Sequence, residues 1–314
     1  MEPEMEACVS KTVAVIGCIF MTLLYVAILY APTLILRLPP PSSLNNFLIR
    51  RFICAAIASI LSLLFSALIL PVRSGEASDI FSVYGIRADH IWQAVVFPLF
   101  LTSLMYAGSL VLKCLLLVNS WKTDFDNGGE FLFDRIKSIT QTFLSYLLSI
   151  ASNLLAWRNY VVAPLTEELV FRACMIPLLL CGGFKIYTVI FICPIFFSLA
   201  HLNHLMEIYR SQNYSLLKAS MAVGLQLGYT VVFGWYASFL FVQTGHLVAP
   251  LIAHVFCNFM GLPVMVARRR GLVTVAFIAG IVAFVWLLFP ITKPDLYNYR
   301  TENCKCWNGY CSWN

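Results

Sequence analysis

Eight apolar segments, each long enough to cross a lipid bilayer, limit what this chain can fold into. A span needs about 20 predominantly apolar residues. Such segments lie near 12–36, 52–70, 91–118, 160–181, 184–206, 218–243, 246–265 and 272–293. Only 11% of the residues are charged and 60% are hydrophobic, which excludes an ordinary soluble domain. The sequence therefore predicts an all-α polytopic membrane protein with about eight transmembrane helices.

Polar segments divide the chain into three expected regions. A polar loop at 119–137 ends an N-terminal three-span region, 1–137, and is followed by a helical core, 138–293. A C-terminal tail, 294–314, contains three cysteines. Within the core, residues 138–157 mix serine, threonine and amide side chains with leucines. This mixture favours a helix that lies at the membrane surface or on the bundle, not a ninth span.

The basic residues of the loops predict an orientation. The loops after the first, third, fifth and seventh spans carry twelve lysines and arginines, against seven on the opposite side. Because positively charged loops tend to stay in the cytosol, we expect the first set of loops to be cytosolic. The net charge of +6 is modest and gives no indication of nucleic-acid binding.

Three ionisable residues interrupt the fourth apolar segment. Each charged group at the bilayer centre costs about 2.5–3.5 kcal/mol on insertion scales, so such groups are usually functional. Glu168 and Arg172 are four residues apart on a helix and are expected to form an ion pair. Glu167 is rotated by about 100° from Glu168 and lacks that partner. A carboxylate in such an apolar setting is a candidate general base.

Two further polar clusters lie in separate spans. Phe197 precedes His201 by four residues in the fifth span, and His254 precedes Asn258 by the same spacing in the seventh. Neutral histidine and asparagine are suitable donors to an oxyanion, and His201 could help Glu167 hold a water molecule. At 1.5 Å per residue, all of these residues can meet in the cytosolic half of the bilayer. The sequence thus predicts one intramembrane active site built from three helices.

The three clusters resemble the motifs of a known family. Glu167-Glu168-Leu-Val-Phe-Arg172, preceded by Arg158-Asn159, matches EExxxR, while the other two clusters match FxxxH and HxxxN. Together they are similar to the type II CAAX prenyl endopeptidases, which belong to the CPBP intramembrane proteases. The resemblance covers about residues 155–265, so 138–293 would be a CPBP-type catalytic core.

The resemblance implies an eight-helix enzyme of the endoplasmic-reticulum membrane. Its substrates would be farnesylated or geranylgeranylated CaaX proteins, from which it removes the last three residues without a metal or other cofactor. By motif, Glu167 and His201 would activate the water, and His254 and Asn258 would form the oxyanion hole. Glu168 and Arg172 would support the site.

Three alternatives remain open from the residues alone. Glu167, His201 and His254 could ligate zinc as two histidines and one carboxylate, although the chain lacks an HExxH helix. A non-catalytic membrane scaffold or a proton-coupled transporter would also carry intramembrane carboxylates and histidines. Cys257 lies beside His254, but a buried cysteine is usually inert.

Overall fold

The computed structural model describes residues 9–70, 77–126, 140–142, 144–145, 148–202, 216–265 and 271–297. Every regular element within these ranges is a helix, which confirms the predicted all-α class. In chain order they are α1 (Lys11–Leu34), α2 (Leu44–Ile69), α3 (Ala77–Val83), α4 (Ile91–Met105), α5 (Ala107–Asp126), α7 (Leu154–Trp157), η1 (Arg158–Val162), α8 (Ala163–Glu168), η2 (Leu169–Cys174), α9 (Met175–Cys181), α10 (Ile186–Ala200), α12 (Leu216–Thr244), α13 (Val248–Met260), α14 (Gly271–Ile291) and η3 (Pro294–Leu296).

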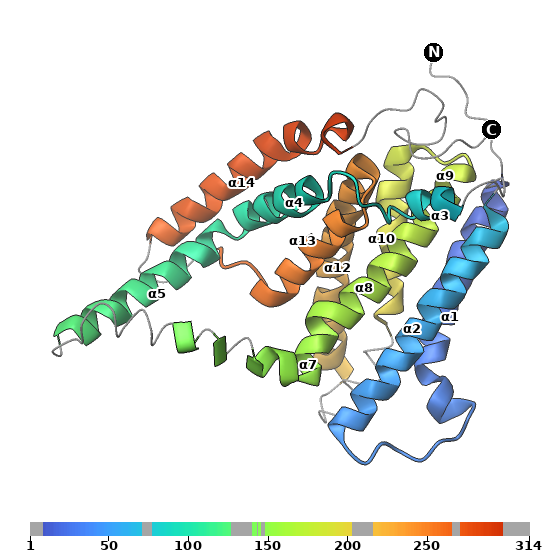
Figure 1. The fold of residues 1–314 in the computed structure, drawn as a ribbon, viewed down its shortest axis with the longest axis horizontal. Coiled ribbons are helices and arrows are strands. Elements are labelled where there is room, and N and C mark those ends of the chain that lie inside the picture. Colours follow the sequence, from blue (N-terminus) through green and yellow to red (C-terminus); the bar gives the residue numbers. More distant parts are fainter. Residues whose placement is uncertain are drawn as a thin grey trace.

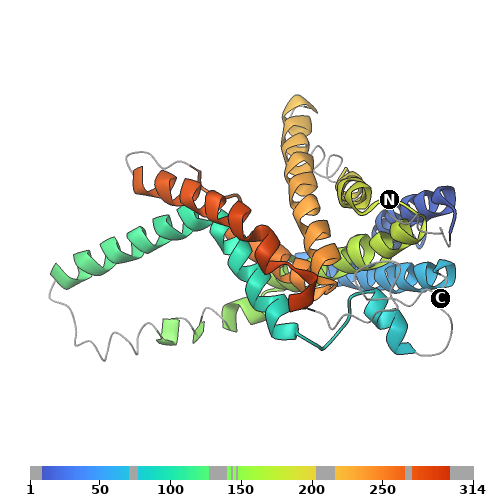
Figure 2. The same ribbon diagram turned by 90° about the horizontal axis from the view of Figure 1, so that it is seen from above.

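The helices form a bundle with an arm (Figure 1). The bundle contains α1, α2, α10, α12, α13 and the continuous helical run from α7 to α9. In the arm, α14 packs against α4 and α5, and α4 joins the arm to the bundle by packing on α13. Seen from above, the arm extends away from α1 and α2 (Figure 2).

The predicted number of eight spans is not confirmed. Within the described ranges, four helices are long and apolar enough to cross a membrane, and a fifth span results if α4 and α5 count as one. These two are bent by 79° at Tyr106, whose hydroxyl donates to the Gly261 carbonyl at 2.7 Å. The apolar helices α10 and α13 are shorter than a full span, and turns of π-helix interrupt the run from α7 to α9.

The start of α2 differs from the predicted segment. The helix begins at Leu44, eight residues before the expected start at 52, because Ser43 caps it. The Ser43 side chain accepts a hydrogen bond from the backbone N–H of Asn46 at 3.2 Å, as an N-cap residue does. Arg50 and Arg51 therefore belong to the helix and not to the preceding loop. The connection from α1 to α2 and helix α7 lie at the same end of the bundle, the lower end in Figure 1.

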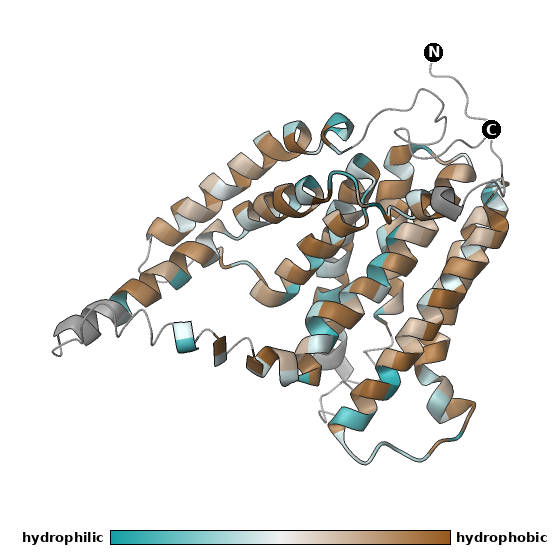
Figure 3. Cartoon of the chain, viewed as in Figure 1, coloured by the Kyte–Doolittle hydropathy of each residue, from teal (hydrophilic) through white to brown (hydrophobic). Residues whose placement is uncertain are grey.

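Large apolar side chains cover the outside of the helices. Hydrophobic residues dominate α1, α2 and α14, whereas hydrophilic segments interrupt the run that contains α8 (Figure 3). Leu68 is 86% exposed and Trp286 77% exposed. Exposed apolar surface of this extent indicates contact with a non-aqueous partner. In a chain with several spanning helices, that partner is the lipid.

The described part of 138–157 is helical for much of its length. Residues 140–142, 144–145 and 148–152 are helical, and all of them except Ile150 are exposed. This exposure does not fit a ninth span buried in the bundle. Of the expected cysteine-containing tail, 294–314, only the residues up to 297 lie within the described ranges, and these exclude its three cysteines.

Glycine allows the arm to pack closely. A Cβ atom at Gly280 of α14 would collide with the Leu104 carbonyl oxygen and lie 2.7 Å from the Ala107 Cβ. Small residues allow membrane helices to approach in this way. The close approach fixes α14 against the bend between α4 and α5.

A buried histidine lies at the opposite end of the bundle from α7. His246, between α12 and α13, is fully buried, and its ring lies 6.5 Å from the Tyr297 ring. Burial, reinforced by the positive charge of Arg87 and opposed by Asp89, lowers the pKa of His246 to about 4. The ring is therefore neutral in the folded protein at neutral pH.

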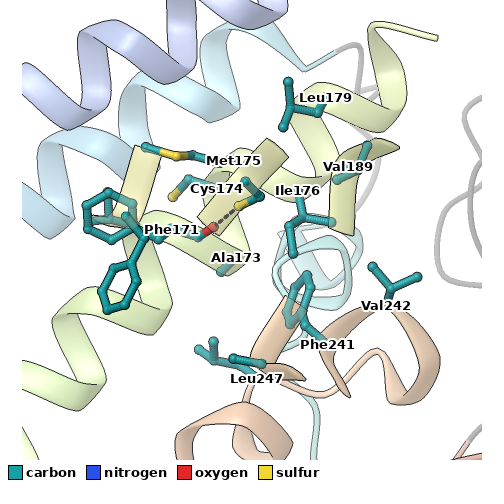
Figure 4. Packing of buried hydrophobic residues seen from close by; sticks show 14 of the residues in the cluster. Phe171, Ala173, Cys174, Met175, Ile176, Leu179, Val189, Phe241, Val242 and Leu247 are labelled. Atoms are coloured by element: carbon teal, nitrogen blue, oxygen red, sulfur yellow. Dashed lines mark hydrogen bonds between the residues drawn. The ribbon is translucent and has the colours of Figure 1, made fainter. Parts of the chain in front are cut away.

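The core of the bundle surrounds η2 and α9. Phe171, Ala173, Cys174, Met175 and Ile176 are all fully buried, and side chains of α10 and α12 pack against them (Figure 4). The Cys193 thiol also donates to the Phe171 carbonyl at 2.7 Å. This cysteine therefore does more than fill space as a small hydrophobe.

Candidate active site

Turns of π-helix flank the pair of glutamates. Helix α8 is only six residues long and lies between η1 and η2. Such insertions into α-helices are frequent at functional sites. At the end of η1, the backbone N–H of Ala163 donates to the Arg158 carbonyl, five residues earlier. In the same register, the next backbone N–H would donate to the Asn159 carbonyl. That next residue is Pro164, which has no N–H, and the Asn159 carbonyl is left for another donor.

Asn258 supplies that donor. Its Nδ2 donates to the Asn159 carbonyl oxygen at 2.8 Å, which ties α13 to the beginning of the glutamate-bearing run. A primary amide has two N–H groups, so one remains for a further acceptor. The sequence predicted Asn258 as an oxyanion donor but gave no indication of this bond, which depends on the local π-helical register.

Glu168 and Arg172 form the expected ion pair. Arg172 Nη1 lies 3.1 Å from Glu168 Oε1, and both side chains are fully buried. The guanidinium carbon also lies 4.4 Å from the ring centroid of Phe197 and 5.9 Å from that of Phe233. Cation–π contacts of this kind stabilise a desolvated cation by up to about 2 kcal/mol. They offset part of the cost of burying Arg172.

His254 connects the two glutamates. Its Nδ1 lies 2.7 Å from Glu168 Oε1, and its Nε2 lies 3.7 Å from Glu167 Oε2. The bond to Glu168 was not predicted, since nothing in the sequence indicates a contact across 86 residues. It gives Glu168 a second role, because a carboxylate bound to one ring nitrogen fixes the orientation of the imidazole.

The bond to Glu168 restricts which protons His254 can carry. A neutral imidazole has one N–H, and if that proton lies on Nδ1, then Nε2 is an acceptor. The sequence predicted that His254 is neutral and donates to the oxyanion. If it donates from Nε2, then Nδ1 carries no proton and must accept a hydrogen bond from a protonated Glu168 carboxyl group. Otherwise both ring nitrogens must be protonated for Nε2 to donate.

His201 faces the same region from the end of α10. Its Nδ1 lies 2.9 Å from the Phe197 carbonyl oxygen. A carbonyl can only accept, so Nδ1 carries the proton, and in the neutral ring Nε2 is an acceptor. The Phe197 ring centroid lies 4.7 Å from that of His201. The four-residue spacing of the motif thus fixes both the orientation and the tautomer of this histidine.

Two cavities meet at Glu167 and His201. The larger cavity has a volume of about 230 Å³ and is also lined by His254, Cys257 and Asn258. The smaller cavity, about 120 Å³, extends from Glu167 and His201 toward α1 and α2. A water molecule takes about 30 Å³ of liquid, so the larger cavity can hold several. The structure thus places all four predicted catalytic residues on one polar cavity.

The arrangement bears on the zinc and cysteine alternatives. Among the residues that the structure describes, no three His, Cys, Asp or Glu side chains are grouped so as to hold a metal ion. Cys257 lines the larger cavity and is only 5% exposed. The two histidines instead point at carbonyl and carboxylate oxygens, an arrangement suited to moving protons.

Comparison with known proteins identifies the family of the chain. The family model described as "Type II CAAX prenyl endopeptidase Rce1-like" matches residues 149–260, which contain every motif residue discussed above. The chain is 61% identical over 306 residues to CAAX prenyl protease 2 of Arabidopsis thaliana, covering 98% of each protein. It is 34% identical to CAAX prenyl protease 2 of Homo sapiens, over 91% of this chain and 83% of the human protein.

A third relative, CAAX prenyl protease 2 of Rattus norvegicus, is 30% identical over 91% of this chain and 82% of its own length. No solved structure matches the chain significantly. Matches of this extent cover nearly the whole chain and include its N-terminal helices. The chain therefore belongs to the type II CAAX prenyl endopeptidases, a family of membrane-embedded proteases.

Proposed function

We propose that this protease removes the C-terminal tripeptide, aaX, from prenylated CaaX proteins with water activated by Glu167 and His201. The observation that carries the proposal is the larger cavity, onto which Glu167, His201, His254 and Asn258 all face. The relatives named CAAX prenyl protease 2 support the substrate class. In this proposal Glu167 and His201 hold the attacking water, and His254 and Asn258 bind the carbonyl oxygen of the scissile bond.

The reaction begins with a water molecule between the Glu167 carboxylate and His201 Nε2. As the water oxygen attacks the scissile carbonyl carbon, Glu167 takes its proton. The Asn258 amide and His254 Nε2 donate to the oxyanion that develops. The proton then passes to the departing nitrogen, the C–N bond breaks, and the products are a prenylcysteine carboxylate and a free tripeptide.

The proposal requires a proton on His254 Nε2. Two carboxylates, one guanidinium and one imidazolium sum to zero charge, and pairing of opposite charges avoids the penalty of an unpaired buried ion. In this arrangement Glu168 and Arg172 do not touch the substrate. They hold His254 in place and balance its charge.

The membrane supplies the substrate. A prenyl chain gains about 0.8 kcal/mol per CH₂ buried in lipid, so farnesylated or geranylgeranylated proteins are concentrated at the bilayer. Arg51 and Arg158 line the smaller cavity and Arg50 adjoins Arg51, and basic residues favour the cytosolic side. We place the site in the cytosolic half of the endoplasmic-reticulum membrane, as the family resemblance implies.

A zinc-dependent version of the same cleavage is the second candidate. Glu167, His201 and His254 line a single cavity, although in the described structure they are not grouped closely enough to hold a metal ion, so zinc would have to draw them together. These residues provide a donor set that zinc accepts. The two candidates differ in their response to a chelator.

The test is cleavage of a farnesylated CaaX peptide by the purified full-length protein, with and without a chelator, followed by mass spectrometry of both products. We expect a free tripeptide and a rate that the chelator does not change. Loss of cleavage with the chelator, restored by added zinc, would establish the metal version. A folded wild type that releases no tripeptide would refute the proposed function and favour the scaffold or transporter.

A further inference from the structure

The smaller cavity has apolar walls and two arginines on its lining, Arg51 and Arg158. It lies between α1 and α2 on one side and η1, α8 and α10 on the other. Leu29, Leu48, Phe52 and Ala55 contribute to its walls, and Arg51 lines it as well. With Arg51, Arg158 and Glu167 on its lining, the cavity carries a net positive charge among apolar walls, which suits an apolar ligand with one negative charge.

The Arg51 guanidinium is held in place by two aromatic rings. Its central carbon lies 4.9 Å from the Tyr30 ring centroid and 5.2 Å from the Phe47 ring centroid. Arginine stacked on aromatic faces keeps its planar set of donors, which matches the two oxygens of a carboxylate. The two ring contacts therefore orient the Arg51 guanidinium, a group whose geometry suits a carboxylate.

Glu167 and His201 line this cavity as well as the larger one. A chain whose scissile bond lies at Glu167 can therefore extend from the junction of the two cavities into the smaller one. Arg51 lies on α2 and Glu167 lies on α8, and these two helices are neighbours. A departing segment of three residues, at most about 10–11 Å long when extended, would have to run only from one helix to the next.

We propose that the smaller cavity binds the departing aaX tripeptide and that Arg51 binds its C-terminal carboxylate. The inference rests on the proposed function and adds a specificity residue to it. The two aliphatic side chains pack against the apolar walls, and the terminal carboxylate meets the guanidinium. Arg158 lines both cavities and adds positive charge at their junction.

The assignment explains how an endopeptidase selects a bond three residues from the chain end. The departing segment has to reach from the activated water to the Arg51 guanidinium, so a segment of another length fits less well. A peptide with one additional C-terminal residue places its carboxylate beyond Arg51, and a C-terminal amide removes the negative charge. Both changes are expected to slow cleavage without altering the prenylcysteine.

The test compares kcat/KM for a prenylated CaaX peptide and the same peptide with a C-terminal amide. Hydrogen bonds to charged groups are worth roughly 10- to 100-fold in binding, so the wild type should prefer the free carboxylate by about this factor. Arg51→Gln should lose most of that preference. It lowers kcat/KM for the carboxylate peptide and leaves the amide nearly unchanged, and Arg51→Lys restores part of the preference.

Arg50→Gln is the matched control. It removes the same charge one residue away, from a side chain that donates to the Pro39 carbonyl and does not line the smaller cavity. It should retain the wild-type preference.

Equal wild-type rates on the two peptides would overturn the inference, whether or not the Arg51 variants fold, and would leave the proposed function intact. An equal loss on both peptides in Arg51→Gln would show a structural role and would also overturn it. A wild type that cleaves neither peptide would refute the proposed function and the inference with it.

Discussion

Replacing Glu168 with alanine should destabilise the protein strongly, because it leaves Arg172 buried without its counter-ion. Both side chains are fully buried and their charged atoms lie 3.1 Å apart. Removing one partner of such a pair typically costs about 3–5 kcal/mol. At about 2 °C per kcal/mol for a chain of this size, the Tm in detergent should fall by about 6–10 °C.

The double variant Glu168→Ala/Arg172→Met separates the ion pair from simple loss of packing. It removes both charges and keeps an apolar side chain on the Phe197 ring, so it should be more stable than Glu168→Ala alone. The assay is thermal unfolding of the purified proteins, with Arg172→Met completing the cycle. A Glu168→Ala Tm within about 1 °C of the wild type, or losses that simply add in the double variant, would refute the reasoning.

Three further outcomes follow from the structure. Asn258→Ala should lower kcat by about 10²–10³-fold, the usual loss for one oxyanion donor, and unchanged single-turnover rates would remove it from that role. Gly280→Ala should lower the Tm by the equivalent of about 1–3 kcal/mol of overpacking, because the added Cβ would meet the Leu104 carbonyl. Gly228→Ala is the control and should keep the wild-type Tm, because its Cβ would meet nothing within 4 Å. Equal Tm values for the two variants would contradict this packing. The pKa of His246 is lowered by burial to about 4, so the unfolded state binds a proton below about pH 6.5 while the folded state does not. The free energy of unfolding should therefore fall by up to about 3 kcal/mol as the pH drops from 6.5 to 4, and it should fall more steeply in the wild type than in His246→Phe. Parallel pH profiles of the two proteins would contradict this.

The sequence predicted the helical membrane class because long apolar segments have few alternatives in lipid. It was less accurate about the ends and continuity of the helices. The capping by Ser43 moved the start of α2 to Leu44, and a bend at Tyr106 divided one expected span into α4 and α5. Neither the cap of Ser43 nor the polar contacts of Tyr106 can be read from the apolar pattern.

The candidate site could be predicted residue by residue but not in its internal contacts. The four-residue spacing indicated the Glu168–Arg172 pair, which is confirmed. The bond from His254 to Glu168 joins residues 86 positions apart, and the bond from Asn258 to Asn159 depends on the proline after a π-helical turn. Contacts of this kind arise from tertiary packing, which local spacing does not determine.

The most direct measurement is the rate of tripeptide release by Glu167→Gln, which keeps the shape of the side chain but cannot take the proton of the water. Asp295→Asn, a carboxylate-to-amide change in η3 outside the site, provides the control. If Glu167 is the general base, Glu167→Gln loses nearly all cleavage, about 10²–10⁴-fold, while its Tm stays near that of the wild type. Wild-type cleavage by well-folded Glu167→Gln would contradict the account.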